Sequence, residues 1–129
     1  MKKFLLMTIL MMTFSGCGGT AASYKHLSAD EAIKIMQTEK NILILDVRTR
    51  EEYDKKHIPN AVLLPIEELR KGNFEPLKDK NQKILIYCWT GRRAEDSAQI
   101  LIDNGYRNVY EFGGLVDWTG EVEGAEVAN

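Results

Sequence analysis

The stretch that decides how this chain folds is residues 84–98, with the sequence ILIYCWTGRRAEDSA. Residues 84–87 form a continuous apolar, partly β-branched run, which is typical of a strand covered on both faces of a parallel sheet. From Ala94 onward the apolar residues recur at helical spacing, at Ala98, Leu101 and Ile102. The stretch therefore predicts a buried strand, a short loop that begins at Cys88, and a helix.

Cys88 lies where a thiol is placed for chemistry. At the carboxyl end of a strand it faces the start of the next helix, and ligand sites of α/β sheets lie at such strand ends. Unpaired backbone N–H groups and the positive end of the helix dipole favour a thiolate there and any anion beside it. An inert core thiol is the alternative, but the glycine-containing loop favours a nucleophile.

The length, composition and net charge of the chain argue against several classes of protein. The 129 residues leave room for one domain, with 44% hydrophobic and 28% charged residues. The net charge of −2 and the lack of a basic stripe with interleaved aromatic residues argue against a nucleic-acid partner. The two histidines, His26 and His57, are far apart, so the sequence shows no zinc-ligand spacing and predicts no metal site.

The first 16 residues predict a signal peptide. Lys2 and Lys3 precede an apolar run over 4–14 that is too short to span a membrane. Residues 15–17, Ser-Gly-Cys, resemble the end of a bacterial lipobox, which implies cleavage before Cys17 and lipidation of Cys17. An ordinary signal peptide with a chance cysteine is the alternative. We expect residues 17–23 to form the lipidated cysteine and a short tether, on a protein exported and anchored to a bacterial membrane, facing the periplasm or the exterior.

Strand-like and helix-like segments alternate along the rest of the chain. This alternation predicts an α/β fold of three layers, in which helices cover both faces of a mostly parallel sheet of about five strands. The domain is expected over 24–120, with Gly113 and Gly114 in a tight turn and residues 121–129 as a flexible tail. The expected strands are 24–27, 42–45, 61–64, 84–87 and 109–112. The expected helices begin after Ser28 and Thr49, near Pro65, at about Ala94 and at Leu115.

Three linked motifs give this chain its resemblance to the rhodanese-like family, which includes single-domain sulfurtransferases. The first motif runs over 46–61 and contains DVR, EY and HIPNA; the second is YC at 87–88 with Gly91 and Arg93; the third is GY at 105–106, Val109, GG at 113–114 and Trp118. In order and at plausible spacing, they extend the resemblance over residues 26–118.

The resemblance implies sulfur transfer through Cys88. The cysteine would take sulfane sulfur from thiosulfate or a polysulfide, become a persulfide, and pass the sulfur to cyanide, a thiol or an acceptor protein. It implies no metal or organic cofactor. This chemistry needs a site that holds a thiolate and a negative donor, and the backbone N–H groups from the loop can form such an anion nest. The substrate-binding loop comprises Trp89, Thr90, Gly91, Arg92 and Arg93.

Other residues are expected to support that loop. We expect Arg93 to pair with a carboxylate, and Asp46, at the end of a neighbouring strand, is the best candidate. Asp46 would then be structural rather than a catalytic acid. Arg48 would brace the second helix. Trp89 could gate the site or meet an acceptor protein.

Two other functions stay open. Phosphatase and arsenate-reductase relatives resemble the pattern Cys-x5-Arg, whereas Cys88 and Arg93 give Cys-x4-Arg, a shorter loop that suits a sulfur atom carried on the cysteine. A binding or sensory module could also use the anion nest without turnover. The intact Cys88 argues against that reading.

Overall fold

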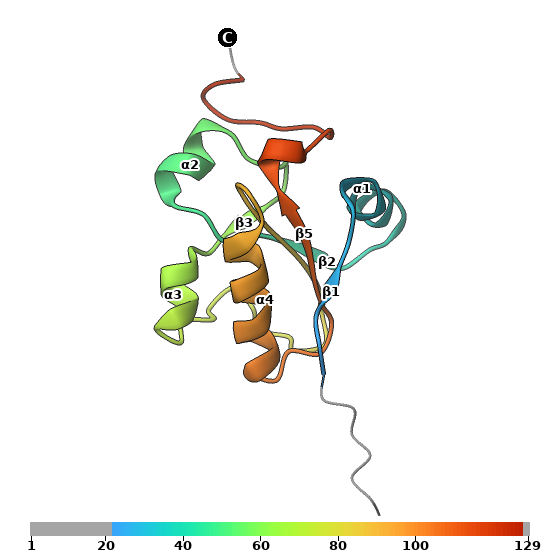
Figure 1. The fold of residues 1–129 in the computed structure, drawn as a ribbon, viewed down its shortest axis with the longest axis vertical. Coiled ribbons are helices and arrows are strands. Elements are labelled where there is room, and N and C mark those ends of the chain that lie inside the picture. The colour runs from blue at the N-terminus through green and yellow to red at the C-terminus, as the bar shows by residue number, and fades with distance from the viewer. Residues whose placement is uncertain (1–21, 128–129) are drawn as a thin grey trace, which may run out of the picture.

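A single parallel sheet forms the centre of the molecule in the computed structural model, which describes residues 22–127 (Figure 1). Its five strands lie in the order β1-β5-β4-β2-β3, and every neighbouring pair runs parallel. The strands are β1 (Lys25–His26), β2 (Ile42–Asp46), β3 (Val62–Leu63), β4 (Lys83–Cys88) and β5 (Val109–Gly114). The predicted α/β fold with about five mostly parallel strands is confirmed.

Helices cover both faces of this sheet (Figure 1). One core lies between the sheet and the side chains of α3 and α4, and a second core lies between the opposite face and α1. β4 supplies both, since Ile84, Ile86 and Cys88 belong to the first core and Leu85 and Tyr87 to the second. The helices are α1 (Ala29–Thr38), α2 (Arg50–Lys55), α3 (Ile66–Arg70), α4 (Arg92–Asp103) and the 3₁₀ helix η1 (Leu115–Asp117).

Side-chain caps set where two of these helices begin. The Ser28 side chain accepts a hydrogen bond from the Glu31 backbone N–H at the start of α1. At the start of α2, Thr49 and Glu52 form a reciprocal capping box. This box fixes Glu52 at the sheet edge where β4 ends.

The structure corrects two expectations about the C-terminal part. Gly113 and Gly114 do not form a separate tight turn, because β5 continues through both and passes directly into η1. Residues 121–127 are not the predicted flexible tail. His57 and Glu123 form an antiparallel bridge, with both N–H···O distances at 2.8 Å, and Val122 packs against the second core.

The predicted signal peptide, Cys17 and most of the predicted tether lie outside the described residues. Within residues 22–127, none of the helices has the length and apolar content needed to cross a bilayer.

Candidate active site

Cys88 is the last residue of β4, and α4 begins at Arg92. Its side chain is buried, and its Sγ accepts a hydrogen bond from the Gly91 backbone N–H at 3.0 Å. Gly91 caps α4 with a φ of +113°, a left-handed conformation that glycine adopts without strain. The loop thus bends back so that a backbone donor at the helix start points at the sulfur.

Arg93 connects the loop to α2. Its guanidinium donates two hydrogen bonds to the Glu52 carboxylate, at 2.7 and 2.9 Å. The bond to Glu52 raises the pKa of Arg93, and the neighbouring Cys88 also contributes to this increase. Arg93 in turn lowers the pKa of Glu52 to about 2, with help from the Thr49 capping bonds. A permanent cation therefore lies beside the thiol.

The expected pair between Arg93 and Asp46 is wrong. Asp46 is fully buried, and its carboxylate accepts hydrogen bonds from the Arg48 side chain at 2.8 to 3.2 Å and from the Tyr87 hydroxyl at 2.5 Å. Arg48, two residues on, reaches Asp46 from inside the same turn, whereas Arg93 points across the loop toward α2. Asp46 therefore pairs with Arg48 and Tyr87 rather than with Arg93.

This buried cluster holds the far end of α2. The Arg48 guanidinium donates to the Lys56 carbonyl at 2.6 Å, directly after the last residue of α2. The Tyr87 hydroxyl accepts a hydrogen bond from the Ile58 backbone N–H at 3.0 Å. α2 is therefore tied to the site at both ends, through Glu52 at its start and through the residues that follow its end.

β5 supports the loop from the other side. A Cβ atom on Gly114 would lie 1.9 Å from the Trp89 carbonyl oxygen, and one on Gly91 would lie 3.3 Å from the Gly113 Cα. The Trp89 carbonyl also accepts a hydrogen bond from the Val116 N–H at 3.1 Å. Gly114 is needed because the loop backbone packs directly on it, whereas Gly113 is needed for its left-handed backbone conformation, with a φ of +83°.

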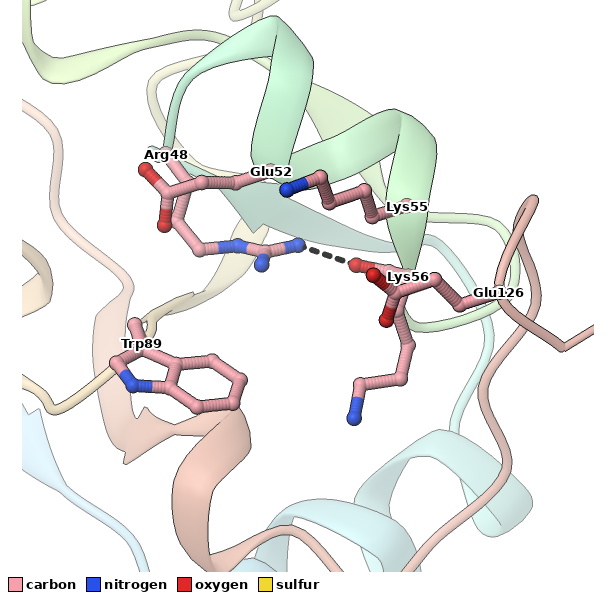
Figure 2. Close-up of a pocket in the computed structure, with 6 residues that line it drawn as sticks. All are labelled: Arg48, Glu52, Lys55, Lys56, Trp89 and Glu126. Atoms are coloured by element: carbon pink, nitrogen blue, oxygen red, sulfur yellow. Dashed lines mark hydrogen bonds between the residues drawn. The ribbon is translucent and has the colours of Figure 1, made fainter.

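A pocket of about 310 Å³ opens beside the loop, between Trp89 and α2 (Figure 2). The Trp89 side chain is 40% exposed, and the Lys56 ammonium lies 5.7 Å from the centre of its indole ring. The pocket is lined by Arg48, Glu52, Lys55, Lys56, Trp89 and Glu126.

The structure brings the predicted loop residues together but gives them different surroundings. Thr90 and Arg92 are exposed, Gly91 is buried, and Arg93 is partly buried in its pair with Glu52. The sequence reasoning missed Glu52 as the partner of Arg93. A signal was present, because Glu52 is the capping-box acid of a helix that starts at the same sheet edge.

Within residues 22–127, no group of three or more histidine, cysteine, aspartate or glutamate side chains is placed to hold a metal ion.

The fold and the site define a class of protein. It is an α/β domain whose central parallel strand presents one cysteine in a short loop at a helix start, beside a partly buried arginine–glutamate pair. A model of the rhodanese-like domain family matches residues 28–121, more than half of the chain. The chain therefore belongs to the rhodanese-like family, as its motifs predicted.

Individual relatives agree with this assignment. The chain is 33% identical to the thiosulfate sulfurtransferase GlpE of Coxiella burnetii over 96 residues, which cover 74% of this chain and 87% of that protein. It is 36% identical to the putative sulfur carrier protein YrkF of Bacillus subtilis over 104 residues, which cover 80% of this chain but only 55% of that protein.

Solved structures share the fold. A rhodanese-like domain protein from Staphylococcus aureus has a TM-score of 0.68 and 31% identity, with 78% of this chain and 98% of that chain covered. A rhodanese from E. coli, solved with anions, has a TM-score of 0.60 and 30% identity, with 65% and 99% covered.

Proposed function

We propose that this chain is a sulfurtransferase that carries sulfane sulfur on Cys88 as a persulfide, from thiosulfate or a polysulfide to a thiol or cyanide. The observation that carries the proposal is the position of the Cys88 Sγ, which accepts the Gly91 N–H at 3.0 Å at the start of α4 and lies beside Arg93. The relatives named thiosulfate sulfurtransferase support it.

The loading step follows from this geometry. The Cys88 thiolate attacks the outer sulfur of thiosulfate, the S–S bond of the donor breaks, and its electron pair leaves with sulfite. The persulfide left on Cys88 is anionic, so the backbone donor of the loop and the Arg93 cation stabilise it. Because Cys88 is buried, the donor must displace side chains of the loop to reach it, and the exposed Trp89 beside Cys88 is the candidate for that displacement.

The pairing of Arg93 disfavours phosphate chemistry. A phosphatase of this superfamily would need a free arginine to wrap a tetrahedral oxyanion, whereas both terminal nitrogens of Arg93 already bind Glu52. The Cys-x4-Arg spacing agrees with a loop shaped for a smaller group.

Mass spectrometry of the protein after incubation with thiosulfate tests the proposal. We expect residues 22–129 to gain one sulfur atom at Cys88, which dithiothreitol removes, and we expect Cys88→Ala to gain none. Lys78→Gln, an exposed variant outside the loop that keeps the thiol, serves as the control and should still gain sulfur. If neither thiosulfate nor polysulfide adds mass to the wild-type chain, the proposal is wrong.

The predicted membrane anchor is part of the same proposal and is supported by the sequence of residues 1–17 alone. In bacteria that express the full chain, radiolabelled palmitate should enter the protein and the protein should sediment with membranes. Cys17→Ser should abolish the labelling. Unchanged labelling of that variant would show that Cys17 is not lipidated.

A further inference from the structure

The pocket between Trp89 and α2 carries charges that sulfur loading does not use. The Lys55 side chain is exposed and that of Lys56 is partly buried, and both extend from the end of α2 to line the pocket. Among residues 22–127, neither ammonium group makes an ion pair. Lysines at a helix C-terminus also stabilise the helix dipole, but that role does not require them to line a pocket.

The remaining lining residues leave this pocket cationic. The Arg48 charge is neutralised by Asp46 at 2.8 Å, and the Glu52 charge by Arg93 at 2.7 Å. Glu126 contributes one carboxylate, positioned by a hydrogen bond from its backbone N–H to the Lys55 carbonyl at 3.0 Å. Two lysines against one glutamate favour an anionic ligand.

The indole ring of Trp89 lies on the opposite side of the pocket. Figure 2 shows the Trp89 indole across the pocket from the Lys56 side chain, and the Lys56 ammonium lies 5.7 Å from the ring centre. Trp89 follows Cys88 directly, and Glu52 binds the arginine that neighbours Cys88. A ligand held here would therefore lie against the loop that carries the reactive sulfur.

We propose that this pocket binds the sulfur acceptor, and that the acceptor is a small thiol bearing a carboxylate. The inference rests on the proposed function, because a second substrate must reach the persulfide after sulfite has left the loop. The pocket volume of about 310 Å³ lies at the lower end of small-molecule sites, so it suits a small thiol better than a protein. The Lys56 ammonium, which faces Trp89, binds the carboxylate, and Lys55 adds a second positive charge beside Glu52 (Figure 2). Glu126 offers a partner for an ammonium group, as in an amino-acid-derived thiol.

The discharge step balances as a simple exchange. The acceptor thiolate attacks the outer sulfur of the Cys88 persulfide and forms a new S–S bond. The bond between that sulfur and Cys88 Sγ breaks, and its electron pair returns to Sγ as the thiolate. The product is the persulfide of the acceptor, and no oxidant or reductant is consumed.

Separate measurement of the two half-reactions tests this assignment. Protein loaded with thiosulfate and freed of sulfite is mixed with 3-mercaptopropionate or with the neutral 2-mercaptoethanol, and the second-order discharge rates are compared per thiolate. In the double variant Lys55→Gln/Lys56→Gln we expect the rate with 3-mercaptopropionate to fall about fivefold or more, as for the loss of a partly exposed ion pair. The rate with 2-mercaptoethanol should change by less than about twofold, because that thiol carries no carboxylate for the lysines to bind.

Two further variants sharpen the result. Glu126→Gln should raise the rate with 3-mercaptopropionate, because it removes the one unpaired negative charge of the pocket. Lys78→Gln removes an exposed lysine that does not line the pocket and should leave the discharge rates with both thiols unchanged. Equal losses for both thiols in the double variant, or no loss, would overturn the inference. A loss confined to the loading step would assign the lysines to the donor and would also overturn it.

Ligand binding without turnover separates this inference from the proposed function. Titration of unloaded Cys88→Ala protein with 3-mercaptopropionate should change the tryptophan fluorescence, and the two lysine substitutions should remove the change. A chain that failed to load sulfur but showed this binding would refute the proposed function while keeping an anion pocket. A chain that loaded sulfur without lysine-dependent binding or discharge would refute only the inference.

Discussion

The Glu52 carboxylate joins three parts of the site. It binds the Arg93 guanidinium, it completes the capping box with Thr49, and it lines the pocket beside Trp89. A glutamate at this helix position would ordinarily be assigned to capping alone. Here the same side chain also fixes the cation next to Cys88, so a change at Glu52 affects stability and chemistry together.

At this residue scale, Glu52→Gln should alter how stability depends on pH. Arg93 lowers the pKa of Glu52 from its ordinary value of 4.5 to about 2 in the folded protein. The contribution of the Glu52–Arg93 pair to the free energy of unfolding is thus complete above about pH 4.5 and is lost as the pH falls toward 2. Because the pair is partly exposed, we expect the variant to lose about 1 kcal/mol at pH 7 and less at pH 3. Urea unfolding at both pH values measures the difference.

The matched control is Glu67→Gln. Glu67 also binds an arginine, Arg70, at 2.8 Å, but both side chains lie on the exposed face of α3. The control should change the free energy of unfolding by less than about 0.5 kcal/mol at either pH. Equal pH profiles for the two variants would show that the Glu52–Arg93 pair does not form in solution.

At the scale of elements, the contact between β5 and the loop after β4 decides the shape of the site. The pairing of β4 with β5 shifts register between Ile86 and Cys88, and the loop then packs on Gly113 and Gly114. A strand of ordinary residues could not approach the Trp89 carbonyl so closely. Gly113 and Gly114 therefore belong to strand β5 and also lie against the backbone of the loop.

Gly114→Ala should damage this contact directly. The new Cβ would lie 1.9 Å from the Trp89 carbonyl oxygen, so the loop must shift, at a cost of about 1–3 kcal/mol. We expect slower sulfur loading as well, because the displaced loop no longer aims the Gly91 N–H at Cys88. Thermal unfolding and the rate of mass gain with thiosulfate measure the two effects.

Gly72→Ala is the control that distinguishes backbone strain from the steric clash at Gly114. Gly72 has a φ of +82° and nothing within 4 Å of its Cβ position, so the substitution costs only about 1 kcal/mol of backbone strain. Its loading rate should match that of the wild type. Normal loading by Gly114→Ala would mean that the loop does not depend on β5.

At the scale of the whole molecule, the sequence determines the layout better than the side-chain partners. Hydrophobic runs and caps reveal the alternating elements because each is a local signal. The partner of Arg93 is not local. Asp46 and Glu52 both lie at the edge of the sheet where β2 and β4 end. Only the folded structure shows that the Asp46 carboxylate is already paired with Arg48, which leaves Glu52 for Arg93. The C-terminal segment escaped prediction for the same reason, since its hydrogen bonds go to the distant backbone around α2.

Removal of residues 122–129 should therefore destabilise α2, because these residues contact the folded domain. The truncation deletes the bridge between His57 and Glu123, two backbone hydrogen bonds to the carbonyls of Asp54 and Lys55, and the Val122 contact with the core. Partial burial of Val122 and these bonds should together contribute about 2 kcal/mol. We expect a lower melting temperature and faster amide hydrogen exchange at Lys56 and Ile58, which flank the bridge residue His57. Glu126→Gln, which keeps every one of these backbone bonds, should match the wild type in both measurements. If the truncated chain also matched it, the C-terminal segment would not be part of the folded domain.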